Sequence, residues 1–322
     1  MGTELRDNRG LICGFQLRPE NCPLPIEIDH VDPLNAPPYP IWLHFNLNDS
    51  RARDWIEHCG WLSAECRELL LTNDPDIHLE LMGDGTGGVL GDTFADDPDE
   101  FGVLHVYADR ACLLTGRRHP ISAVGSLRRE LTGGTPIGDT SAAFTHLLRH
   151  LAGSFDKTIA THADLIDEAE DRVLSGNFRD ANLGQHRRKM ARLRRQIFAD
   201  RHALASLAHP PSWWEKATVK DLRQIEAVLA SAVQDLELAQ ERARLLTEEI
   251  DSRLTERTNR NLYFVSVAAA VFLPITLISG IFGMNVGGLP WLEDAYGFGW
   301  VMACMLAAVV TALALMRWRQ ML

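Results

Sequence analysis

Seven uncharged residues near the C-terminus could line a path for a cation. They offer amide, hydroxyl and backbone carbonyl oxygens in or beside an apolar run: Asn259, Ser266, Thr276, Ser279, Gly280, Gly283 and Asn285. No Asp, Glu, Lys or Arg occurs between Arg260 and Glu293, so no carboxylate is present to strip water from an ion. Neutral oxygens of this kind suit a divalent cation that keeps much of its hydration shell.

Apolar residues recur between these polar positions. At intervals of three or four they fall nearly on the helical face of Thr276: Leu262, Val265, Ala269 and Leu273. Such a stretch could gate a pore by excluding water, although ordinary packing of one helix on another explains the same pattern. Pro274 lacks an N–H group, so we expect a kink there.

Two charge-free segments, 262–282 and 295–316, are each long enough to cross a hydrocarbon core of about 30 Å. The alternative, two buried helices of a soluble protein, is disfavoured because the second segment has no polar stripe. The loop between them is acidic, and basic residues flank the pair on the other side: Arg257, Arg260, Arg317 and Arg319. The positive-inside rule predicts a multi-pass membrane protein with both termini in the cytoplasm and the acidic loop outside.

The rest of the chain predicts an α+β domain with a mostly antiparallel sheet, then a helical hairpin and one very long helix. Six β-rich runs precede residue 138, and the helical composition after it breaks at Ser175-Gly176-Asn177. Ser212 and Glu215 have the spacing of a capping box, and neither Gly nor Pro follows before Pro274. The predicted divisions are 1–138, 139–211, a stalk helix 212–261, a pore helix 262–285, an external loop 286–294, a second membrane helix 295–316 and a basic tail 317–322.

The stalk has an apolar heptad seam that needs a partner surface. Its positions from Leu222 to Ile250 alternate at three and four residues, and several are alanine. The partner is either other copies of this helix or the preceding hairpin. One helix of that hairpin is acidic and the other basic, so their faces could pair or could simply be solvated.

Composition excludes several functions for the 322-residue chain. The formal net charge of −11 argues against bulk binding of nucleic acid. The six cysteines include no CxxC pair, which argues against a disulfide framework. No catalytic arrangement or cofactor motif stands out, so we predict neither an enzyme nor a bound cofactor.

Two groups of histidine and cysteine residues are candidate zinc ligands. His146 and His150 lie four residues apart on an expected helix, but no third ligand is evident near them. His58, Cys59 and Cys66 are expected to pack rather than to bind metal, and the glycine-rich segment 83–91 is expected to form a hairpin turn.

The run YFVSVAAAVFLPITLISGIFGMN, which ends in Gly283-Met284-Asn285, resembles the CorA superfamily of divalent-cation transporters. The Gly-Met-Asn signature closes the first of two C-terminal membrane segments, as in that family. The following Val286-Gly287-Gly288-Leu289-Pro290 is similar to its zinc-transporting ZntB branch. The resemblance implies a funnel-shaped homopentamer in the lipid of the inner membrane that carries divalent cations, with protons as a candidate coupled ion.

The resemblance also implies roles for single residues. Asn285 and Gly283 would hold the hydrated ion at the external mouth, and Met284 would pack behind them. Thr276 would add a hydroxyl ring, with Gly280 beside it and Asn259 near the cytoplasmic end. Charged residues would serve the two ends of the pore: Glu293 and Asp294 would attract cations outside, and Arg317 and Arg319 would form an inner basic girdle.

Zinc uptake is therefore the leading functional hypothesis. Within the same superfamily, the alternative is a magnesium or cobalt channel gated by cytoplasmic metal. From another class, the alternative is a non-conducting, membrane-anchored coiled-coil scaffold or metal sensor, which would have no need of polar groups at Thr276 and Asn285.

Overall fold

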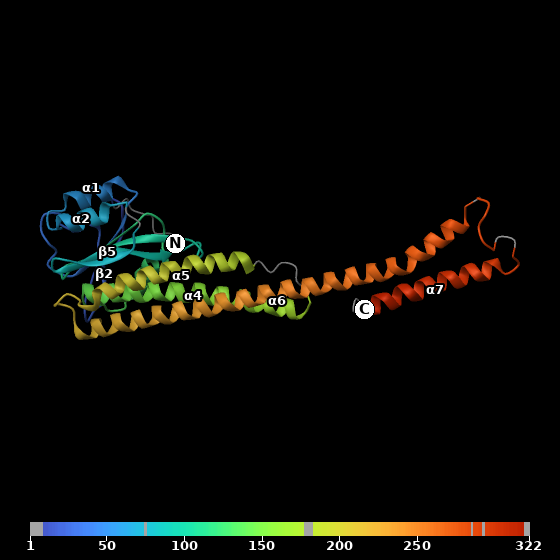
Figure 1. The fold of residues 1–322 in the computed structure, drawn as a ribbon. Coiled ribbons are helices and arrows are strands. Elements are labelled where there is room, and N and C mark those ends of the chain that lie inside the picture. Colours follow the sequence, from blue (N-terminus) through green and yellow to red (C-terminus); the bar gives the residue numbers. More distant parts are fainter. Residues whose placement is uncertain (1–8, 74–75, 177–182, 285, 292–293, 319–322) are drawn as a thin grey trace. The chain divides into compact units, whose positions relative to one another are not determined.

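The structure is a computed structural model of the chain, and it describes residues 9–73, 76–176, 183–284, 286–291 and 294–318 (Figure 1). The chain divides into two compact units, Met1–Leu245 and Leu246–Leu322. Each is described by itself below.

The first unit is built on a seven-stranded sheet with the order β2-β1-β3-β7-β6-β5-β4. Neighbouring strands are antiparallel except β3 and β7, which are parallel. This confirms the predicted α+β domain with a mostly antiparallel sheet. The strands are β1 (Leu11–Gln16), β2 (Leu24–Pro25), β3 (Ile41–Asn46), β4 (His78–Met82), β5 (Gly85–Thr93), β6 (Phe101–Ala108) and β7 (Cys112–Arg117).

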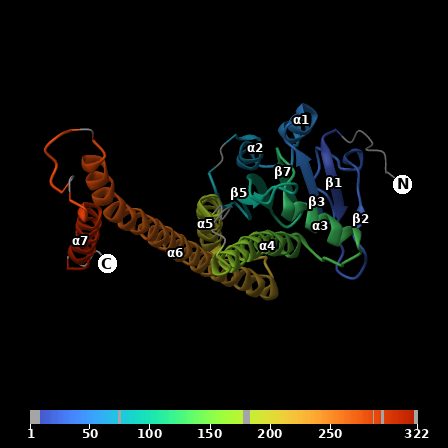
Figure 2. The same cartoon turned by 90° about the vertical axis from the view of Figure 1, so that its right-hand side faces the viewer.

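Helices cover both faces of this sheet (Figure 2). On one face lie α1 (Ser50–His58) and α2 (Ala64–Leu71), and on the other lie α3 (Ser122–Thr132), α4 (Thr140–Leu174) and α5 (Leu183–Ala205). Alternate residues of β3 point to opposite faces, so that Ile41, Leu43 and Phe45 join the core beneath α1 and α2. Two short 3-10 helices, Ile28–His30 and Ser206–Ala208, complete the unit.

The segment 50–72, which has a helical pattern throughout, forms two helices rather than one. The Ser63 hydroxyl accepts a hydrogen bond from the Cys66 N–H at 3.1 Å and so caps a new helix. The predicted start of α4 is confirmed, because the Asp139 carboxylate accepts from the Ala142 N–H at 2.7 Å.

The glycine-rich segment corrects one prediction. Only its first residues form the turn, where Gly83 has φ +59°, and the strand β5 already begins at Gly85. A Cβ atom on Gly91 would overlap the Gln196 side chain of α5. Gly91 therefore lets α5 pack directly against the strand, which is a common reason for glycine within a sheet.

The long helix α6 (Lys216–Phe282) begins one turn later than the predicted capping box. Residues 212–215 form a turn instead, and the Glu215 carbonyl accepts from the Val219 N–H at 3.1 Å. Trp214 is buried with its ring edge-on to Phe144 at 5.8 Å, and Trp213 Nε1 donates to the Asp84 carbonyl at 2.6 Å. These tertiary contacts outweigh the local capping pattern.

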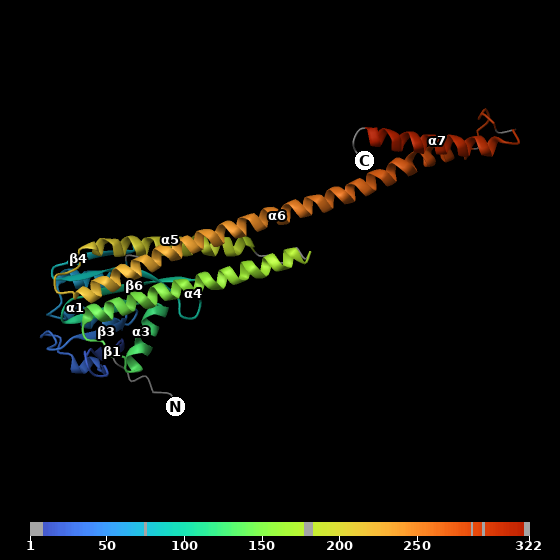
Figure 3. The ribbon, with the colours of Figure 1, turned by 90° about the horizontal axis from the view of Figure 1, so that it is seen from below.

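The helices α4, α5 and the first part of α6 run side by side (Figures 1 and 3). The heptad positions Leu222, Leu229 and Ala243 are buried within this single chain. Ion pairs tie α6 to both neighbours: Arg149–Asp221 at 3.1 Å, Arg194–Glu237 at 2.5 Å and Arg242–Glu170 at 3.1 Å. The hairpin is therefore the partner of the seam, at least as far as Ala243.

Candidate functional site

The described residues include two helices that are long and apolar enough to cross a membrane. One lies within α6, and the other is α7 (Gly297–Trp318). Figures 1 and 3 show α7 alongside the last turns of α6. The arrangement agrees with the two charge-free segments of the sequence.

The membrane part of α6 has one half-buried stripe. Its positions recur at helical intervals: Val267, Val271, Ile275, Ile278 and Phe282. The helix α7 has a matching half-buried stripe: Val301, Met305, Val309, Ala312 and Met316. Since the two helices lie alongside each other, these stripes form the contact between them.

The residues predicted to line a pore lie on the other side of α6. At about 100° per residue, their face is centred roughly 160° around the helix from the half-buried stripe. Leu262, Val265 and Leu273 are 59%, 63% and 71% exposed, and Thr276 and Gly280 are exposed too. Asn259 is also exposed but lies about 80° from the centre of this face.

Hydroxyl groups near this face donate hydrogen bonds to carbonyl groups of their own helix. Thr276 Oγ1 donates to the Phe272 carbonyl at 2.8 Å, and Ser266 Oγ donates to the Leu262 carbonyl at 2.8 Å. A hydroxyl oxygen has acceptor lone pairs left after it donates its proton. Thr276 therefore presents an oxygen that can accept a hydrogen bond from the hydration shell of a cation.

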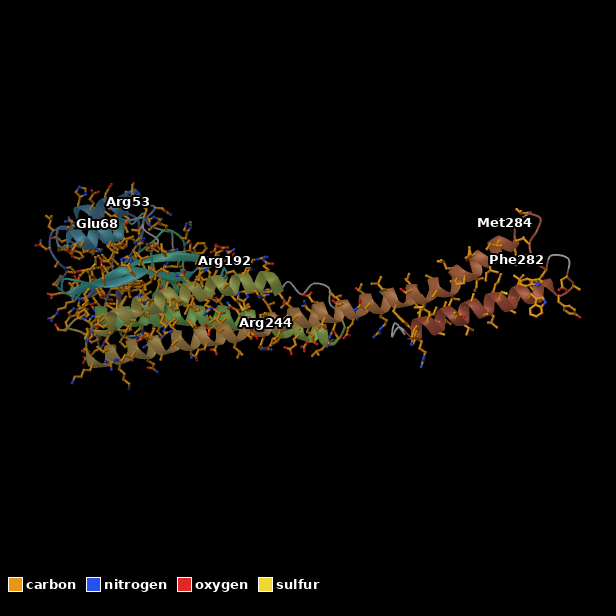
Figure 4. The ribbon with its side chains drawn as sticks, viewed as in Figure 1. Arg53, Glu68, Arg192, Arg244, Phe282 and Met284 are labelled. Carbon is orange, nitrogen blue, oxygen red and sulfur yellow. The ribbon has the colours of Figure 1, made fainter. Side chains whose placement is uncertain are left out.

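The helix α6 ends at Phe282, immediately before the Gly-Met-Asn motif. The Gly283 N–H donates to the Ser279 carbonyl at 2.8 Å, and Met284, which is exposed, follows the last turn (Figure 4). A Cβ on Gly283 would lie 3.0 Å from the Ser279 carbonyl oxygen, so a larger residue would crowd this turn. Asn285 lies outside the described residues.

Of the four charged residues predicted at the two ends of the pore, the structure describes two. Asp294 Oδ1 accepts from the Tyr296 N–H at 2.9 Å just before α7, and Arg317 lies in the last turn of α7. Glu293 and Arg319 lie outside the described residues.

The pair His146 and His150 has a third partner, which the spacing of residues in the sequence could not reveal. Glu130 of α3 binds both rings, with Oε1 at 2.9 Å from His146 Nδ1 and Oε2 at 2.7 Å from His150 Nε2. Burial alone would raise the pKa of Glu130, but these hydrogen bonds and the histidine charges outweigh it and lower the pKa. Both imidazoles are thus engaged by one carboxylate.

The cysteine cluster packs as expected. Cys59 and Cys66 are buried in the core beneath α1 and α2, and burial raises the pKa of the Cys59 thiol to about 11. His58 Nδ1 bonds the Asp54 carbonyl at 2.7 Å instead of approaching the thiols. The searched residues contain no group of three or more His, Cys, Asp or Glu side chains placed to share a metal ion.

Comparison with known proteins gives this arrangement a context. The family model described as CorA-like Mg2+ transporter protein matches residues 39–319. The chain belongs to the CorA family. It is accordingly a divalent-cation transporter and not an enzyme.

Relatives within the CorA family cover almost the whole chain. The divalent cation transporter CmaX of Pseudomonas aeruginosa is 28% identical over 96% of this chain and 95% of its own length. The zinc transport protein ZntB of Yersinia pseudotuberculosis is 28% identical over 87% of this chain and 86% of its own. The solved structure of full-length CmaX matches with a TM-score of 0.83, 27% identity and 99% coverage of both chains.

Proposed function

We propose that this CorA-family chain takes up zinc across the inner membrane through the central pore of a homopentamer, with both termini in the cytoplasm. One observation carries the proposal. The face of α6 that holds Leu273, Thr276 and Gly280 is turned away from α7 and is exposed in the single chain. A face that combines apolar residues with hydroxyl and backbone oxygens is suited to a water-filled path.

The need for several copies follows from the membrane. Two helices cannot enclose an aqueous path, and polar groups within the hydrocarbon region must face protein or water. Identical copies of α6 around an axis would enclose their exposed faces, while α7 would contact lipid. The number five comes from the family resemblance.

Each predicted site residue has a role in this arrangement. Gly283 and Asn285 hold the hydrated ion at the outer mouth, with Met284 packed behind them, and Thr276 forms a hydroxyl ring further in. The apolar gate consists of Leu262, Val265 and Leu273. At the two ends, Glu293 and Asp294 attract cations from outside, Asn259 lies toward the cytoplasm, and Arg317 and Arg319 form the inner girdle.

We propose zinc rather than magnesium as the transported ion because of the residues that follow the Gly-Met-Asn motif. Gly287-Gly288-Leu289-Pro290 is similar to the ZntB branch, and a protein named as a zinc transporter aligns with most of the chain. The family as a whole is described as Mg2+ transporters, so magnesium is the competing ion. No Asp, Glu, His, Lys or Arg lies between Arg260 and Glu293. If zinc uptake is coupled to protons, the proton therefore moves with water or hydroxide, or through carboxylates outside this segment such as Glu293, Asp294 or Glu248.

The test is metal flux into proteoliposomes that contain the purified full chain. We expect zinc entry to exceed magnesium entry and to rise with an inward proton gradient. Asn285→Ala should abolish the flux, because it removes the amide that holds the hydrated ion at the mouth.

Three results would contradict parts of this proposal. Magnesium entry that is indifferent to protons would favour a channel of the magnesium type. Unchanged flux in a well-folded Asn285→Ala variant would remove the pore assignment. The absence of flux for both ions would favour a non-conducting scaffold.

A further inference from the structure

Two imidazoles from different helices face each other in the first unit, far along the sequence from the predicted pore. His162 of α4 and His186 of α5 bring their Nδ1 atoms to 3.3 Å, with ring centroids 5.5 Å apart and ring planes at 66°. The His162 side chain is only 3% exposed, whereas His186 is half-buried. One side of the pair is therefore open to solvent at His186.

A carboxylate sets the proton position on the inner ring. Asp99 Oδ1 lies 2.9 Å from His162 Nε2, and its other oxygen binds the Lys189 ammonium. Since the carboxylate accepts a hydrogen bond, the Nε2 atom carries the proton and the Nδ1 atom has a free lone pair. That lone pair is directed toward His186.

The distance between the two nitrogens fits a shared metal ion. Two imidazole nitrogens that each lie about 2.0–2.1 Å from one zinc, at a tetrahedral angle, are about 3.3 Å apart. Ligating histidines usually donate their second N–H to a carboxylate, which holds the ring and raises its basicity. Asp99 occupies that second position for His162.

Electrostatics keep the inner ring in the form that binds metal. Burial lowers the pKa of His162, and the charges of His186 and Lys189 lower it further, against the opposing effect of Asp99. A neutral imidazole is the form that ligates a metal ion. The Lys189 charge is itself paired with Asp99, which reduces its repulsion of a bound cation.

We propose that His162 and His186 form a binding site for one divalent transition-metal ion, held through the two Nδ1 atoms and completed by water on the His186 side. Imidazole nitrogen suits zinc and cobalt, while magnesium prefers oxygen ligands. With two protein ligands the site binds weakly and reversibly. It lies outside the proposed pore and does not depend on the transported ion.

The test is a Co2+ titration of the tag-free full chain in detergent, read by visible absorption. Tetrahedral Co2+ on nitrogen ligands absorbs strongly, whereas the hydrated ion of the pore would stay octahedral and absorb weakly. We expect a strong band that zinc removes and magnesium does not. His186→Gln should abolish the band, and Asp99→Asn should weaken Co2+ binding about 10–100-fold, as loss of a supporting carboxylate does elsewhere.

His150→Gln is the matched control, because it also removes a half-buried imidazole that bonds a side chain of another helix. It should leave the band intact, and so should Asn285→Ala, which affects only the pore proposal. Identical titrations of the unmodified chain and the His186→Gln variant would overturn the inference and leave a simple hydrogen bond between the two rings. Flux is not part of this readout, so failure of the metal site and failure of the transport proposal remain distinct.

Discussion

The two units satisfy their polar groups in different ways. In the first, some buried side chains bond across elements: Trp42 Nε1 and His44 Nδ1 both lie 2.8 Å from Thr115 Oγ1. In the second, hydroxyls bond within their own helix, as Thr276 does to Phe272 and Thr311 to Ala307. The second pattern needs no neighbouring element, which suits helices surrounded by lipid.

Their apolar side chains differ in the same way. Large side chains in the core of the first unit, such as Phe144 and Phe155, are fully buried. In the second, Phe264 is 74% exposed and Leu273 is 71% exposed. The first unit is complete within one chain, while the second requires lipid or further copies to cover its surface.

The largest expected effect separates the two units by stability. Phe144→Ala should destabilise the first unit by about 3–5 kcal/mol, because it leaves a cavity against Trp214. Phe264→Ala, the matched change on the exposed surface of α6, should change it by less than about 0.5 kcal/mol. Urea unfolding in detergent, followed by near-UV circular dichroism, measures both. Equal losses of stability would show that the exposed apolar surface of the second unit is packed as tightly as the core of the first.

The next effect distinguishes the two apolar helices from each other. Thr276→Val removes an oxygen from the exposed face of α6 and should lower zinc flux about tenfold, the equivalent of about 1.4 kcal/mol. Thr311→Val removes the same type of helix-bonded hydroxyl from α7 and should leave flux unchanged. Initial rates in proteoliposomes measure both, and equal losses would remove the distinction between a pore helix and an outer helix.

The smallest effect concerns the buried polar network of the first unit. Burial and the Arg117 charge lower the pKa of His44 from 6.5 to about 3. The folded state then binds fewer protons than the unfolded state, so stability falls as pH drops below about 6.5. Between pH 7.5 and 5.8 the loss should be about 1 kcal/mol.

His44→Gln keeps the approximate size of the side chain and its ability to form hydrogen bonds, but the amide of Gln does not gain a proton in this pH range. The variant should lose less stability over the same pH interval, whatever its stability at pH 7.5. Urea unfolding at the two pH values measures the difference. Parallel pH profiles for both proteins would show that His44 does not contribute.

Much of the fold could be predicted because its signals are local. The β-rich runs before residue 138 indicated the sheet, and the helical composition after it indicated the start of α4. The start of α6 was mispredicted, since Trp214 packs on Phe144, which lies in a different helix. Gly91 was wrongly assigned to a turn for the same reason, because the helix that packs on it follows about a hundred residues later.

The sequence by itself determined the two apolar segments that are long enough to cross a membrane and the residues that share one face of α6, because both depend on the residues of a single helix. Only the tertiary structure showed that α7 covers the opposite face of α6. It alone placed Glu130 between His146 and His150, and Asp99 beside His162 and His186. These groups come from separate elements, and packing of helices on the sheet, rather than any local pattern, sets the distances between them.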